Sequence, residues 1–206
     1  MSKSYIVNEI FHTIQGEGYW SGRAAVFCRF SRCNLWTGRE EDRATAICQF
    51  CDTDFLAGTR MSRDDLVSKI FNTWPHGAHK PMVVFTGGEP LLQLDEELVW
   101  ILKDLSFYVA VETNGTQPVP DGLDWVCVSP KAGTKLHPIY ADELKLVFPQ
   151  PLLMPDELLD YPTDHRWISP MDGPDIEANT KAAIDYVMAD PVWRLNVQTH
   201  KQVGIR

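Results

Sequence analysis

The chain has 206 residues and a formal net charge of −9, and its 44% apolar and 23% charged residues are typical of a soluble globular protein, which excludes disordered, collagen-like and fibrous classes. The acidity and the lack of any run of Lys or Arg argue against nucleic acid as a partner, because phosphate neutralisation needs a concentrated basic face. No stretch has the roughly 18 apolar residues of a membrane span, and the first residues lack the apolar segment of a signal peptide. We therefore expect a cytoplasmic protein with no membrane partner.

Short, nearly continuous apolar runs recur along the chain and predict strands buried on both faces, as in a parallel sheet. These runs lie at 24–30, 82–85, 107–111, 125–128, 144–148, 167–168 and 193–197. Helical patterns separate some of them. One begins after Ser62 as N-cap, a second covers 94–105, and a third covers 176–188 and ends before Asp190-Pro191.

The alternation of strands and helices predicts right-handed crossovers and an α/β fold. The connections at 117–124 and 149–162 are too short or too rich in proline for a full helix. Because a complete eight-fold barrel needs about 250 residues, we expect an incomplete, modified (β/α) barrel with reduced helices, in a single domain over 1–206. Ligands of such folds bind at the carboxyl ends of the strands, which is where the polar motifs of this chain lie.

Four of the five cysteines lie within residues 28–51, and in a reducing compartment such cysteines favour metal ligands or core residues over disulfides. Cys28, Cys33, Cys48 and Cys51 are separated by 4, 14 and 2 residues. As four ligands they resemble a structural zinc site. As three, Cys33, Cys48 and Cys51 would hold an iron–sulfur cluster and leave one iron open to a substrate or cofactor.

The surroundings of Cys28 favour three ligands. Cys28 shares one strand face with Val26 and Phe30, and a cysteine on an apolar face is more often a buried small hydrophobe than a ligand. Cys127, between two valines, has the same interpretation.

Six motifs occur in order: HTIQGEG at 12–18, CDTDF at 51–55, TGGEP at 86–90, ETNGT at 112–116, SPK at 129–131 and QTHK at 198–201. Together they resemble the 7-carboxy-7-deazaguanine synthases, radical S-adenosylmethionine (SAM) enzymes of queuosine biosynthesis. The resemblance runs from residue 8 to the C-terminus. The aromatic residue between Cys48 and Cys51 agrees with the superfamily motif, whereas the gap of 14 residues replaces the usual three and is found in members of this family.

The resemblance implies a radical SAM domain with its cluster-binding loop at 31–55, where Cys33, Cys48 and Cys51 hold a [4Fe–4S] cluster. SAM and Mg²⁺ are the other implied cofactors. The implied activity is that of a lyase, which contracts the ring of 6-carboxy-5,6,7,8-tetrahydropterin to 7-carboxy-7-deazaguanine with loss of ammonia. A homodimer and an electron donor such as flavodoxin are implied as well.

The implied SAM site combines several of these motifs. By itself TGGEP indicates a tight strand-to-helix turn whose glycines also allow close approach to a ligand. Glu112 ends an apolar strand, where an ionised carboxylate is costly unless it is paired. Ser169 stands where family members often have Gln, so its side-chain contact departs from the family pattern. The implied SAM-binding residues are Phe50, Cys51, Asp52, Gly88, Glu89, Glu112, Ser129, Pro130, Lys131, Ser169, Pro170, Met171 and Asp172.

For Mg²⁺, the resemblance implies the hydroxyl of Thr53, although the residues alone would indicate only an Asx-rich turn at 52–54. Arg29 lies on the strand face opposite Cys28 and can pair with a substrate carboxylate. Arg206 stands where relatives have Pro, and its terminal carboxylate is implied to reach the pterin. The implied substrate-binding residues are Ile14, Gln15, Gly16, Glu17, Arg29, Thr86, His200 and Arg206.

Two other functions fit part of the sequence. A radical SAM activase that makes a glycyl radical on a partner protein would need a protein-docking surface, but would not need the IQGEG and QTHK segments. A zinc-stabilised binding module would be colourless, with one zinc and no acid-labile sulfide.

Overall fold

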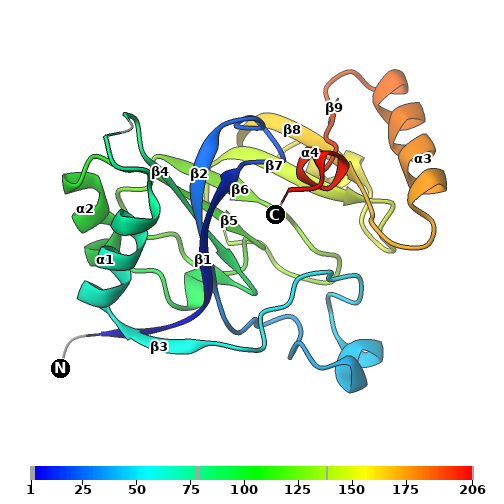
Figure 1. Ribbon diagram of the computed structural model, residues 1–206. Helices are drawn as coiled ribbons and strands as arrows, with labels where there is room; N and C mark the ends of the chain where they lie inside the picture. The colour runs from blue at the N-terminus through cyan, green and yellow to red at the C-terminus, as the bar shows by residue number, and fades with distance from the viewer. Residues whose placement is uncertain (1–2, 78, 138, 206) are drawn as a thin grey trace.

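The computed structural model describes residues 3–77, 79–137 and 139–205, so the predicted role of Arg206 lies outside the described residues. A single sheet forms the body of the protein (Figure 1). Its strands are β1 (Ser4–Ile14), β2 (Ala24–Phe30), β3 (Thr59–Ser62), β4 (Met82–Gly87), β5 (Tyr108–Thr113), β6 (Trp125–Val128), β7 (Ala141–Phe148), β8 (Thr163–Pro170) and β9 (Arg194–Leu195).

The strand order is β3-β1-β2-β4-β5-β6-β7-β8-β9. β1 pairs antiparallel with β2 and β3, and all other neighbours pair in parallel. The carboxyl ends of β2 and β4 to β9 therefore lie along one edge. Across the described ranges, β3 and β9 remain the two free edges of the sheet, which confirms the predicted incomplete barrel.

Helices cover only part of the outer face. α1 (Arg63–Thr73) and α2 (Glu96–Asp104) lie beside the first half of the sheet, and α3 (Ile176–Ala189) lies beside β8 at its other end (Figure 1). Only the short η3 (Pro155–Leu158) lies between β7 and β8, and the described parts of the β5–β6 and β6–β7 connections contain no helix. The expectation of reduced helices is confirmed. In the described chain, no helix is long and apolar enough to cross a membrane.

The two faces of β2 have different environments, as the alternation of its residues predicts. Val26, Cys28 and Phe30 are fully buried and belong to one apolar cluster with residues of α1 and α2. Phe27 and Arg29 face the opposite side, where they line a cavity. The same alternation continues across the parallel strands, so the outer face is an apolar core and the inner face is free to carry polar groups.

Aromatic residues fill the inner face near the amino ends of the strands. The ring of Tyr19 stacks on Trp125 with centroids 5.0 Å apart and on His165 at 4.7 Å. Trp20 meets Trp125 edge-on at 5.5 Å. These rings close one end of the inner space, so a ligand has room only toward the carboxyl ends.

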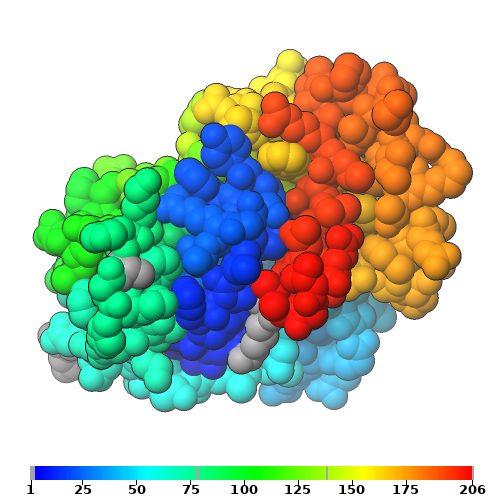
Figure 2. All heavy atoms as spheres, turned by 45° about the horizontal axis from the view of Figure 1, so that its top comes forward, coloured from blue at the N-terminus to red at the C-terminus, as the bar shows by residue number. Residues whose placement is uncertain are grey.

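Hydrogen bonds join the two ends of the fold where strand pairing does not. The turn between β1 and β2 meets the segment that leads into α4 (Thr199–Val203). Thr199 N donates to Gly16 O at 3.0 Å, and Gly18 N donates to Asn196 Oδ1 at 2.8 Å. Figure 2 shows the red C-terminal segment lying against the blue N-terminal strands. This contact completes the wall of the inner space.

Candidate functional site

A cavity of about 690 Å³ lies at the carboxyl ends of the parallel strands. β1, the loop after β2, the ends of β4 to β8 and α4 all contribute to its wall. The predicted site residues in the wall are Ile14, Gln15, Gly16, Glu17, Arg29, Cys33, Cys48, Phe50, Cys51, Asp52, Thr53, Thr86, Gly88, Glu112, Ser129, Lys131, Ser169, Pro170, Met171, Asp172 and His200. Glu89 and Pro130 do not line it. The structure thus brings nearly all the predicted residues to one cavity.

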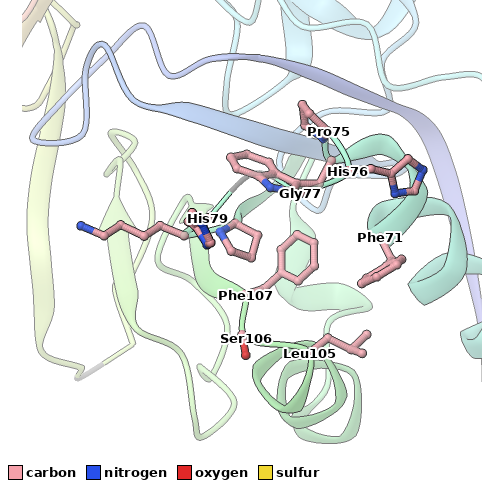
Figure 3. Close-up of a pocket in the computed structure, with 11 residues that line it drawn as sticks. Phe71, Pro75, His76, Gly77, His79, Leu105, Ser106 and Phe107 are labelled. Carbon is pink, nitrogen blue, oxygen red and sulfur yellow. The ribbon is translucent and has the colours of Figure 1, made fainter.

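A second cavity, of about 320 Å³, lies near the amino ends of β4 and β5. Figure 3 shows its lining, which includes Phe71, His76, His79 and Phe107. No residue of the six motifs belongs to this lining. The candidate site is therefore the larger cavity.

Three of the four clustered cysteines face the larger cavity. The Cys48 thiol donates to the Cys51 sulfur, which lowers the pKa of Cys51 to about 6 and raises that of Cys48. Burial raises the pKa of Cys33, although its sulfur accepts a hydrogen bond from Leu35 N at 3.4 Å. Cys28 is instead fully buried in the outer core. The thiols at the cavity are therefore those of the three-ligand interpretation.

In the described part of the chain, no three His, Cys, Asp or Glu side chains converge on a point that a single metal ion would occupy. A cubane cluster takes each thiolate on a different iron and does not require such convergence. The donor set of three thiolates in one loop fits that group.

The glycines of TGGEP let the end of β4 pack against the start of the cysteine loop. A Cβ on Gly87 would lie 2.1 Å from Phe30 O, and a Cβ on Gly88 would lie 2.1 Å from Arg32 O. Glu89 N donates to the same Arg32 carbonyl at 2.9 Å. These contacts fix the backbone immediately before Cys33, and they require glycine because any side chain would meet backbone atoms.

The carboxylate of Glu89 is fully buried and already has three donors. It accepts hydrogen bonds from Leu91 N at 2.9 Å, Thr113 Oγ1 at 2.8 Å and Asn114 N at 2.8 Å. Burial raises its pKa, against the effect of these donors. The side chain of Glu89 therefore joins the loops after β4 and β5, and its predicted contact with SAM stays a prediction.

ETNGT also supports the cysteine loop, through residues that the sequence reasoning did not assign. Asn114 Nδ2 donates to Asn34 Oδ1 at 3.0 Å, and Asn34 Nδ2 donates to Thr116 Oγ1 at 2.8 Å. Asn34 directly follows Cys33. The loop after β5 thus holds the residue next to a predicted cluster ligand.

A buried lysine joins two predicted site carboxylates in the cavity wall. Lys145 Nζ bonds Glu17, and it lies 3.1 Å from Glu112 Oε2. Gln198 Nε2 donates to Glu17 Oε1 at 2.6 Å, and Gln15 Nε2 donates to Glu112 Oε1 at 2.7 Å. The formal charges of the lysine and the two carboxylates sum to −1.

The ion pairs of Lys145 determine its charge and that of Glu17. Burial opposes the charge on Glu17, but Lys145 and the hydrogen bond from Gln198 outweigh it and lower the pKa of Glu17 to about 2. Burial likewise opposes the charge on Lys145, and Glu112 and Glu17 raise its pKa well above the usual value. Sequence reasoning missed Lys145. The feature that could have identified Lys145 is its position as a single cation inside the apolar run of β7.

Two further cations of the wall are already paired. Arg29 faces the cavity as predicted, and its Nε donates to Glu9 Oε1 at 2.8 Å. Lys131 Nζ donates to the carbonyl and the hydroxyl of Ser129, each at 2.7 Å, and burial lowers its pKa. Both hydrogen-bonding arrangements fix the position of a basic side chain at the cavity wall.

α4 covers one side of the cavity. His200 lies so close to Gly16 that a Cβ on the glycine would be 2.0 Å from His200 Nδ1. Lys201 Nζ lies 2.8 Å from Asp52 Oδ2 and also pairs with Asp172. Asp52 follows a predicted cluster ligand and Asp172 follows β8, so one lysine ties the C-terminal helix to two loops of the cavity.

An open (β/α) barrel with a polar cavity at its carboxyl edge is the architecture of an α/β enzyme, and the three free thiols of one loop in that cavity are a donor set suited to a metal cluster. Comparison with known proteins gives the particular family. The 7-carboxy-7-deazaguanine synthase of Caulobacter vibrioides is 50% identical over 208 residues, with 98% of this chain and 99% of the relative covered. That of Bradyrhizobium diazoefficiens is 51% identical over 209 residues, with 98% and 100% covered.

The crystal structure of QueE from Escherichia coli matches with a TM-score of 0.68 at 28% identity, covering 96% of this chain and 95% of that chain. No protein-family model matches the chain. The relatives at about half identity over nearly the whole length show that the chain belongs to the 7-carboxy-7-deazaguanine synthase family, as the six motifs indicated.

Proposed function

We propose that this protein forms 7-carboxy-7-deazaguanine by radical ring contraction of 6-carboxy-5,6,7,8-tetrahydropterin, with loss of ammonia, as a step of queuosine biosynthesis. The observation that carries the proposal is the larger cavity, which gathers three thiols of one loop and both sets of motif residues. The curated relatives that bear the enzyme's name extend over the same length.

Cys33, Cys48 and Cys51 would hold the [4Fe–4S] cluster, with SAM bound by the predicted SAM-binding residues, of which all but Glu89 and Pro130 line the cavity. When bound, the cluster and SAM supply one-electron cleavage of the sulfonium, which provides the radical for hydrogen abstraction. Thr53 would supply a hydroxyl to Mg²⁺. One protein oxygen suits this ion, because Mg²⁺ keeps several waters and substrate oxygens in its octahedral shell.

Different residues of the cavity wall would bind different groups of the pterin. Glu17 stays ionised at neutral pH and can accept hydrogen bonds from ring N–H and amino groups. Gln15 presents an amide beside it, and Arg29 offers a guanidinium to the substrate carboxylate. Such fixed partners hold the reacting carbon in place, which is the main contribution that a protein makes to radical chemistry.

α4 would keep water from the reacting centre. His200 packs on the glycine of the IQGEG segment, and Lys201 holds the helix on two loops. Exclusion of water matters because a reactive radical intermediate is lost to side reactions in an open site.

We further propose that residues 1–206 form one radical SAM domain that works as a cytoplasmic homodimer with an electron donor such as flavodoxin. One sheet extends through the described chain, which supports a single domain. The net charge of −9 supports a small-molecule substrate over nucleic acid.

Anaerobic reconstitution tests the proposal. The protein should turn brown, cleave SAM in the presence of a reductant, and convert the carboxytetrahydropterin to the deazapurine. Replacing Cys48 by Ala should abolish cluster content, whereas Cys28→Ala should retain it. A brown protein that cleaves SAM without making deazapurine would disprove the substrate, and a colourless protein with one zinc would disprove the radical chemistry.

A further inference from the structure

The long gap between Cys33 and Cys48 contains an arginine whose side chain turns back to the last two predicted ligands. Arg43 lies in the short helix η1 (Glu40–Thr45). Its Nη1 donates to Gln49 O at 2.8 Å and to Cys51 O at 3.0 Å. These two carbonyls belong to the tight turn from Cys48 to Cys51. One guanidinium nitrogen therefore bonds two points of the turn that carries two of the three thiols.

The guanidinium is itself held in place on two other sides. Its Nε lies 2.8 Å from both carboxylate oxygens of Glu40. Its carbon lies 4.1 Å from the centroid of the Trp36 ring, which is 8% exposed. The Trp36 indole in turn donates to Arg39 O at 3.1 Å and meets Phe55 edge-on at 5.6 Å. The aromatic support and the carboxylate fix the plane of the guanidinium before any ligand binds.

This arrangement suits an arginine and no other residue. A planar guanidinium can stack on an aromatic face and donate to several acceptors at once, whereas an ammonium on a flexible stem cannot do both. A ligand loop with 14 intervening residues has more conformational freedom to lose than one with three, so its thiols need an additional restraint to stay in place. Arg43 supplies that restraint at the carbonyls next to Cys48 and Cys51.

We propose that Arg43 is a positioning residue for the iron–sulfur site: it fixes the Cys48–Cys51 turn in the orientation that receives the cluster, and its positive charge favours the reduced state. The inference rests on the proposed function, since it assumes that Cys33, Cys48 and Cys51 hold a cluster. The charge effect follows because the potential of such a cluster depends on nearby charge and on hydrogen bonds around it.

The test compares Arg43→Gln and Arg43→Lys with wild type and with Arg39→Gln. Arg39 is the matched control, because it lies in the same loop, its side chain is 68% exposed, and its ion pair with Glu41 is long, at 3.7 Å. Each protein is reconstituted anaerobically, its iron and sulfide are counted, the loss of cluster absorbance to a chelator is timed, and the reduction potential is measured by titration.

Arg43→Gln should lose its cluster about ten-fold faster than wild type, as expected for the loss of charge-assisted hydrogen bonds, and its potential should be more negative. Arg43→Lys keeps the charge, so its potential should stay near that of wild type while its cluster is still lost faster. Arg39→Gln should match wild type in both measurements.

The outcomes distinguish failure of the proposed function from failure of the role of Arg43. A wild-type protein that takes up no cluster would overturn the proposed function itself. A wild-type protein that takes up the cluster, with Arg43→Gln equal to Arg39→Gln in loss rate and potential, would overturn the role of Arg43 alone. Circular dichroism checks folding, and if Arg43→Gln does not fold, Arg43→Lys decides: retention of the cluster at the wild-type rate would refute the positioning role.

Discussion

Replacing Lys145 by Met should destabilise the protein strongly, because the change leaves two carboxylates in the cavity wall without their cation. The side chain of Lys145 is only 8% exposed, and those of Glu17 and Glu112 are 15% and 23% exposed. Breaking a buried pair by removing one partner costs about 3–5 kcal/mol, since the remaining charge stays desolvated. The pKa of Glu17 gives a similar figure: a fall from 4.5 to about 2 on folding corresponds to about 3 kcal/mol at pH 7.

Urea unfolding at pH 7, followed by circular dichroism, measures this loss. For a chain of this size it corresponds to a fall in melting temperature of roughly 6–20 °C. Lys181→Met is the matched control, because Lys181 pairs with Asp185 on the surface of α3 with its side chain 77% exposed. That change should cost no more than about 0.5 kcal/mol.

The pH dependence adds a second measurement with a defined sign. The folded pKa of Glu17 lies below its ordinary 4.5, so its contribution is present above about pH 4.5 and is lost as the pH falls toward 2. Without Lys145, burial would raise the pKa of Glu17, and protonation would then relieve the variant. The difference in stability between wild type and Lys145→Met should therefore shrink between pH 7 and pH 4.5. A cost equal to that of Lys181→Met, or a difference that grows on acidification, would refute the reasoning.

Three further substitutions test residues that connect the loops around the cavity. Glu89→Gln should cost about 1–3 kcal/mol in urea unfolding, because the amide of Gln offers one acceptor oxygen to donors that now share two. Gly88→Ala should cost about 1–3 kcal/mol and reduce the iron content after reconstitution, because its Cβ would collide with Arg32 O; unchanged iron would contradict that reading. Lys201→Met should lower stability by no more than about 1 kcal/mol, since its pairs are partly exposed, yet raise KM through a loosened α4; a normal KM would show that its bond to Asp52 does not shape the cavity.

The sequence predicted the parallel strands well because a sheet buried on both faces leaves continuous apolar runs. β2 and β6 have the predicted bounds, and the N-cap at Ser62 is present, with its side chain accepting from Asp65 N. β1 was not predicted, because its inner face lines a polar cavity and so carries Asn8, Glu9 and Thr13 in place of an apolar pattern. The edge strand β3 has no apolar pattern because none of its four residues is buried.

In the candidate site, too, the sequence predicted residues within local motifs but not the contacts between residues far apart in the chain. Motifs place their residues at strand ends, and the topology then gathers them in one cavity. The sequence marks Lys145 as a cation within an apolar run, but it could not identify the partners of Lys145, because Glu112 and Glu17 lie 33 and 128 residues away. The sequence also could not show the hydrogen bonds of Glu89, because two of its three donors, Thr113 and Asn114, lie 24 and 25 residues further along the chain.

The contact between the β1–β2 turn and α4 also has a consequence for folding. The bond from Thr199 Oγ1 to Gly16 O joins residues 183 positions apart, and it closes the wall that strand pairing leaves open. Contacts of such long sequence separation require the largest loop closure and tend to form after the local ones. We therefore expect the outer core to consolidate first, with the cavity wall closing late and opening early, so that amide exchange at Gly18 and Thr199, whose N–H groups donate across this contact, would be faster than in β4 and β5. Substrate would then enter through the part of the fold that costs least to open.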